Sequence, residues 1–140
     1  MTLAGLRNGL ADAVARAAVL AHTPRFDVAD HAPSTLADVI AHYRATGTLR
    51  VWAGASDACV FDPRTNWTFR AWHDWAHVRT SLGFDVPSEI DLARWQMAEA
   101  GSDSLARLVW VEVAGQAAHY ARTGRFVTDQ IAFALAKGLR

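Results

Sequence analysis

Residues 2–21 read TLAGLRNGLADAVARAAVLA, and their apolar positions decide the fold class. Leucine and alanine recur here at spacings of three and four, at Leu3, Leu6, Leu10, Ala13, Ala17 and Leu20. This spacing places them on one stripe of an α-helix. We therefore expect a long amphipathic helix over 2–21, and the same period returns through most of the chain.

Further helices are predicted on both sides of the middle of the chain. Ser34 is expected to cap a helix that ends at Gly47. Four more are predicted over about 65–82, 87–101, 102–123 and 128–138, with the starts at Thr65 or Asn66, at Pro87 and Ser88, at Ser102 or Asp103, and at Thr128.

The helical period disappears between residues 48 and 65. Leu49, Val51 and Trp52 precede a Gly-Ala-Ser-Asp turn, which is typical of a small hairpin or an ordered loop. No repeat or composition break divides the chain. We therefore predict an all-α single domain over 1–140, a bundle of about six helices with an irregular insertion at about 48–65.

Composition excludes several classes of protein. Fourteen basic and fourteen acidic residues cancel, which argues against general nucleic-acid binding. A single cysteine, Cys59, leaves no intrachain disulfide and fits a reducing compartment. The start of the chain lacks the pattern of a signal peptide, and no stretch approaches the roughly 18 apolar residues of a membrane span. The expected location is the cytoplasm, and a homo-oligomer is compatible with the sequence.

The segment Trp-His-Asp-Trp-Ala-His at 72–77 carries the clearest chemical signal. His73 and His77 are four residues apart, so on a helix they are neighbours and both imidazoles can reach one metal ion. The spacing is that of the His-Glu-x-x-His zinc helix, with Asp74 at the position of the general base. The alternative is that the rings only satisfy buried carbonyl groups.

Glu112 is one of three glutamates and lies in a nearly apolar stretch at 105–114. A carboxylate removed from water costs several kcal/mol unless it is paired, protonated or bound to a metal. Gln116 and His119 follow on the same predicted stripe. A structural alternative is an ion pair with Arg70, Arg79 or Arg107.

We therefore predict a divalent metal site, with zinc first and manganese, iron or magnesium as alternatives. The expected ligands are His73, His77 and Glu112. The predicted supporting and proton-transfer residues are Gln116, Asp74 and His119, of which His119 is either a proton shuttle or a fourth ligand.

The pattern His73, Asp74, His77 and a glutamate thirty-five residues later resembles zinc peptidases whose third ligand is a downstream glutamate. That resemblance implies hydrolysis, although Asp74 stands where those enzymes have glutamate. The chain also resembles HD-type phosphohydrolases, which are all-helical. This second resemblance implies a metal bound by His42, His73, Asp74 and Asp129, with a subsidiary role for His77.

The stretch 66–133 is also similar to small helical proteins of bacteria and phages, a resemblance that implies no activity. The sequence thus favours a metal-dependent hydrolase of a small polar substrate that contains a phosphate or an amide. The alternative is a non-catalytic helical interaction module in which the same side chains form a satisfied polar cluster inside the bundle.

Overall fold

The computed structural model describes residues 2–56, 60–125, 127 and 130–137. These residues are mostly helical, as predicted. The helices are α1 (Leu3–Leu20), α2 (Leu36–Thr46), α3 (Pro63–Thr80), α4 (Val86–Glu99), α5 (Asp103–Val109), α6 (Gln116–Thr123) and α7 (Gln130–Ala136). A π-helical segment, η1 (Trp110–Gly115), joins α5 to α6 into one long helix. No helix among the described residues is long and apolar enough to cross a membrane.

The prediction of an all-α class holds only as mainly helical, because two short strands are present. Strand β1 (Phe26–Ala29) pairs with β2 (Leu49–Trp52) in parallel. Parallel strands need a crossover connection, and α2 provides it. The hairpin predicted within 48–65 is therefore wrong. Strand β2 pairs with β1, which precedes α2, and not with a second strand from the same segment. Leu49 and Val51 are buried on one face of the pair, as the alternation of a strand requires.

The starts of three helices differ from the predicted ones, with α2 beginning one residue later and α3 and α4 beginning earlier. The caps are Thr35 for α2, Asp62 for α3 and Asp85 for α4, in place of Ser34, Thr65 or Asn66, and the pair Pro87 and Ser88. Each cap accepts a hydrogen bond from the backbone N–H three residues later, and a proline follows Asp62 and Asp85 within the first turn. Ser102 caps α5 as predicted. Thr128 lies outside the described residues.

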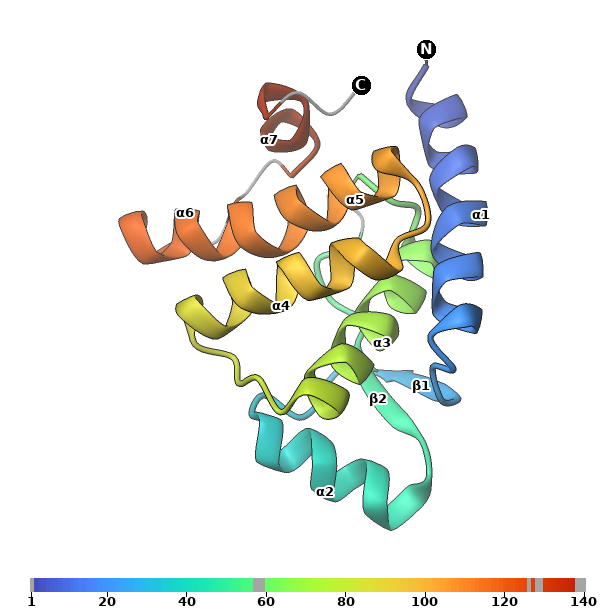
Figure 1. Cartoon of the computed structure of the whole chain (residues 1–140), viewed down its shortest axis with the longest axis vertical. Helices are drawn as coiled ribbons and strands as arrows, with labels where there is room; N and C mark the ends of the chain where they lie inside the picture. The colour runs from blue at the N-terminus through green and yellow to red at the C-terminus, as the bar shows by residue number, and fades with distance from the viewer. Residues whose placement is uncertain (1, 57–59, 126, 128–129, 138–140) are drawn as a thin grey trace.

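Helix α3 lies at the centre of the molecule, with α1 along one side and the two-stranded sheet and α2 along another (Figure 1). Its fully buried Trp72 belongs to the larger hydrophobic core, together with residues of α1, α4 and the long α5–α6 helix. Its fully buried Ala71 belongs to a smaller core with Val39, Leu49 and Val51. Because consecutive residues are held in two cores, the rotation of α3 about its axis is fixed. This rotation places His73 and His77 against α4.

Candidate metal centre

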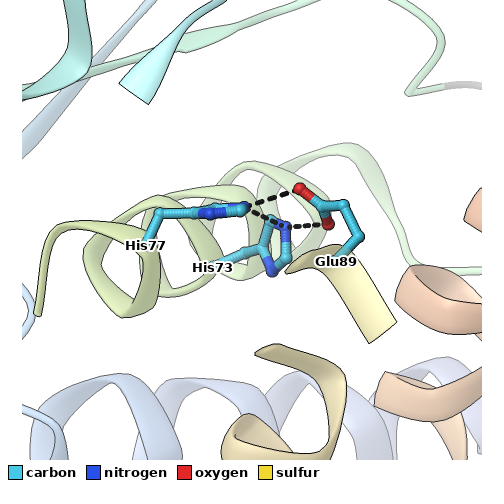
Figure 2. A group of neighbouring side chains, drawn as sticks. All are labelled: His73, His77 and Glu89. Carbon is cyan, nitrogen blue, oxygen red and sulfur yellow. Dashed lines mark hydrogen bonds and ion pairs between the residues drawn. The ribbon is translucent and has the colours of Figure 1, made fainter. Parts of the chain in front are cut away.

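Two histidines of α3 and one glutamate of α4 converge on a single point (Figure 2). His73 and His77 lie on one face of α3 because they are four residues apart. Glu89 lies in the first turn of α4, four residues after the Asp85 cap. The cap fixes where α4 begins, and the start of α4 decides that Glu89 faces the two imidazoles.

The polar atoms of this group lie within hydrogen-bonding distance of one another. His73 Nε2 and His77 Nε2 are 3.1 Å apart. The Glu89 carboxylate places Oε1 at 2.8 Å from His77 Nε2 and Oε2 at 3.1 Å from His73 Nε2. Ligand atoms about 2.1 Å from a tetrahedral zinc ion are roughly 3.4 Å from one another. The three side chains are therefore spaced closely enough to share one metal ion.

The remaining ring nitrogens are held by hydrogen-bond acceptors. His77 Nδ1 lies 2.7 Å from the carbonyl oxygen of Leu82, which the left-handed Ser81 directs back toward α3. His73 Nδ1 lies 2.9 Å from Oε1 of Gln96, a fully buried residue of α4. Each acceptor holds a proton on Nδ1 and so turns the lone pair of Nε2 toward the centre. The structure thus supplies the outer support that metal-binding histidines have.

Glu89 and His73 shift one another's pKa values. Burial alone would raise the pKa of Glu89, but its hydrogen bonds with His73 and His77 outweigh burial and lower the pKa to about 2. Burial alone would lower the pKa of His73, yet the Glu89 carboxylate outweighs it and the pKa is raised. The carboxylate is therefore ionised and available to a cation, whether that cation is a proton on an imidazole or a metal ion.

A cavity of about 540 Å³ opens beside the group. His73, Asp74 and Glu89 line it from α3 and α4, and Glu112 and Gln116 line it from the long helix. Burial raises the pKa of Asp74 to about 6, against the opposing charges of the two histidines. The predicted Asp74 thus lies at the cavity, next to the three converging side chains.

The third member of the group, its carboxylate, is Glu89 in place of the predicted Glu112. Among the described residues, the ligand atoms that lie within 4.8 Å of one another belong to His73, His77 and Glu89. Glu112 lines the same cavity, but its Oε2 accepts a hydrogen bond of 2.8 Å from Gln116 Nε2. Gln116 therefore supports Glu112, and the residue that supports a histidine of the group is Gln96.

His119 is not among the described residues that line this cavity. Its ring packs edge-on against Phe133 of α7, with the ring centroids 5.7 Å apart. The predicted polar stripe that places His119 in line with Glu112 holds only for a regular α-helix. Each turn of η1 contains more residues, so the positions that follow it are rotated about the helix axis. The proton-transfer role predicted for His119 has no geometric support. His42 on α2 is also outside the group, and Asp129 lies outside the described residues.

The sequence alone did not predict Glu89 and Gln96 as residues of this group. Both are polar residues on α4, and the available signal was the scarcity of glutamate together with the position of Glu89 twelve residues after His77. Comparisons with protein-family models, with curated proteins and with solved structures found no match to this chain.

Proposed function

We propose that this protein binds a divalent metal ion, zinc first, on His73, His77 and Glu89 and uses it to hydrolyse a small polar substrate. One observation carries the proposal: both imidazoles are held through Nδ1, so their two Nε2 atoms lie 3.1 Å apart and face one point beside an ionised carboxylate. When neither Nε2 carries a proton, these two nitrogens and the carboxylate repel one another unless a metal ion lies between them. Two imidazoles and one carboxylate form a ligand set that zinc uses in hydrolytic enzymes.

The catalytic part of the proposal is supported by the number of ligands and by the cavity. Three protein ligands leave a fourth position for water, which a bound zinc ion makes acidic enough to act as a nucleophile near neutral pH. The cavity beside the group has room for a small substrate. Asp74 lines it next to His73 and is the residue that we assign to accept a proton from that water.

Elemental analysis of purified, tag-free protein tests the metal. We expect about one equivalent of zinc in the wild type and loss of most of it in His77→Ala and Glu89→Gln, with helical circular dichroism retained. His119→Ala, which removes a histidine outside the group, is the matched control and should keep the metal. If both site variants keep the metal of the wild type, this assignment is wrong.

Hydrolysis is tested separately with p-nitrophenyl phosphate and p-nitroacetanilide as chromogenic substrates. The proposal expects release of the chromophore that a chelator stops and that zinc restores. Zinc bound by the wild type together with no hydrolysis of any ester, phosphate or amide would leave a metal-binding protein without the enzymatic role.

A non-catalytic helical interaction module is the second candidate, and the ion pairs of Glu89 favour it. An imidazole that carries a proton on Nε2 donates it to Glu89 without a metal, at 2.8 Å for His77 or at 3.1 Å for His73. This candidate predicts no stoichiometric metal and a melting temperature that a chelator leaves unchanged. The same elemental analysis thus decides between the two.

A further inference from the structure

Glu112 has a buried carboxyl group and is not one of the three proposed metal ligands. It lies in η1, the only π-helical segment among the described residues, and lines the cavity that the metal centre also lines. Its Oε2 is bonded to Gln116, whereas its Oε1 is buried and has no hydrogen-bond partner. Segments of π-helix inside α-helices occur frequently at functional sites.

A buried carboxylate oxygen without a partner is costly unless it is protonated or accepts a hydrogen bond from water or a ligand. The direction of the Gln116 bond limits what that ligand is. Gln116 Nε2 donates to Oε2, so the ionised carboxylate offers Oε1 only as an acceptor. The matching group is therefore an N–H or O–H donor. Burial raises the pKa of Glu112 to about 7, so the carboxylate is available as an acceptor above neutral pH.

The charges around the cavity argue against a phosphate in this place. Asp74, Glu89 and Glu112 all line it, and Arg70 is the only lysine or arginine among its described lining residues. The Nη1 of Arg70 already donates to the carbonyl oxygens of Trp52 and Gly54. With Glu89 bound to the metal ion, a phosphate dianion would still face the carboxyl groups of Asp74 and Glu112, whereas a neutral amide would face acceptors that suit its N–H.

We infer that Glu112 accepts a hydrogen bond from an N–H group of the substrate, and that the substrates are amides whose carbonyl oxygen reaches the metal centre. This inference rests on the function proposed above. It assigns Glu112 to substrate recognition across the cavity, separate from the three ligands. It also chooses the amide over the phosphate as the substrate class.

Two hydroxamic acids separate the N–H contact from metal binding. Acetohydroxamic acid and N-methylacetohydroxamic acid offer the same two oxygens to zinc, but only the first has an N–H. Their affinities for the zinc-loaded protein at pH 8 are measured by isothermal titration calorimetry. We expect the wild type to prefer acetohydroxamic acid by about tenfold or more, the effect of one hydrogen bond to a charged acceptor.

The preference is expected to disappear in Glu112→Gln. Gln116 still requires an acceptor, so the new amide turns its oxygen to Gln116 and presents its NH₂ group to the ligand. Zinc content should remain that of the wild type. Glu99→Gln removes a glutamate that is paired with Arg79 outside the cavity, so this matched control should keep both zinc and the preference.

Each other outcome overturns a different statement. Loss of zinc in Glu112→Gln would make Glu112 a ligand and would refute the recognition role. Retained zinc with an unchanged preference, or no preference in the wild type, would refute the N–H contact and leave the metal site intact. A wild type without zinc would refute the proposed function and this inference together.

Discussion

Gln96 holds the outer nitrogen of His73 and is fully buried in α4. Its Nε2 has no hydrogen-bond partner, so replacement by leucine of similar size removes an unsatisfied polar group. We predict that Gln96→Leu lowers zinc affinity about 10- to 100-fold, because the imidazole loses its orienting acceptor. The free energy of unfolding of the metal-free protein should change by less than about 1 kcal/mol.

A competition titration with a chelating dye measures that affinity. Gln116→Leu is the matched control, since Gln116 bonds Glu112 instead of a histidine. Equal zinc affinities of Gln96→Leu and the wild type would show that His73 does not depend on this contact.

Glu112 makes stability depend on pH in a direction opposite to that of most acids. Burial raises its pKa from 4.5 to about 7, so between these values the folded protein binds a proton that the unfolded chain has released. Stability from this group is therefore present at low pH and is lost as pH rises from about 4.5 to about 7. The whole span corresponds to roughly 3 kcal/mol at most.

Urea unfolding of the chelator-treated protein at pH 5 and pH 8 measures this effect. Raising the pH from 5 to 8 should lower the free energy of unfolding by about 2 kcal/mol less in Glu112→Gln than in the wild type, because Gln does not titrate. An equal pH dependence in the two proteins would mean that Glu112 is ionised in the folded state.

At the residue scale, the sequence predicted two of the three converging side chains. The spacing of His73 and His77 is local and is preserved on any helix. Glu89 belongs to another helix, and its approach depends on the turn after α3 and on the start of α4 at Asp85. The sequence favoured Glu112 because a glutamate among apolar residues implies a buried partner. That inference was sound for burial, but the geometry gives Glu112 a partner in Gln116.

At the scale of elements, two glycines allow a matched test of backbone conformation. Gly47 ends α2 with φ 72°, and a Cβ there would meet no atom within 4 Å. Gly47→Ala should therefore destabilise the fold by about 1 kcal/mol through conformation alone. Gly9 lies inside α1 in equally open surroundings, so Gly9→Ala should stabilise the fold by about 0.5 to 1 kcal/mol.

Urea unfolding of the two variants measures both changes. Their opposite signs are the prediction, and a loss of stability in Gly9→Ala would contradict the placement of Gly9 inside a regular helix.

The elements that the sequence did not predict share one physical cause. β1 and β2 have four residues each and pair in parallel from positions twenty-three residues apart, as Phe26 with Leu49. Two strands paired in this way need no short turn between them, so the sequence contains no turn residues that indicate the pairing. A hairpin does contain such residues. The π-helical segment η1 packs against α4, and the apolar period of its residues does not distinguish it from a regular α-helix. Helix positions were predictable because their signals, apolar period and stop residues, are local.

At the scale of the whole molecule, the candidate metal centre joins α3 to α4 without being part of the hydrophobic core. The larger core contains Val14, Phe61, Trp72 and Leu105, all of them fully buried. This core does not need the metal, so the chelated protein should remain folded. Binding of zinc to the folded state alone adds a stabilisation that grows with zinc concentration, about 2.7 kcal/mol at one hundred times the dissociation constant.

Thermal unfolding followed by circular dichroism at 222 nm tests this coupling. For a chain of this size such a stabilisation raises the melting temperature by several degrees, roughly 5 to 10 °C. Addition of a chelator should return the wild type to the melting temperature of its metal-free form, with its helical signal intact at room temperature. In Glu89→Gln zinc should leave the melting temperature nearly unchanged, because α4 no longer supplies a ligand. A zinc-dependent increase of equal size in that variant would place the ion elsewhere and would separate α4 from the metal site.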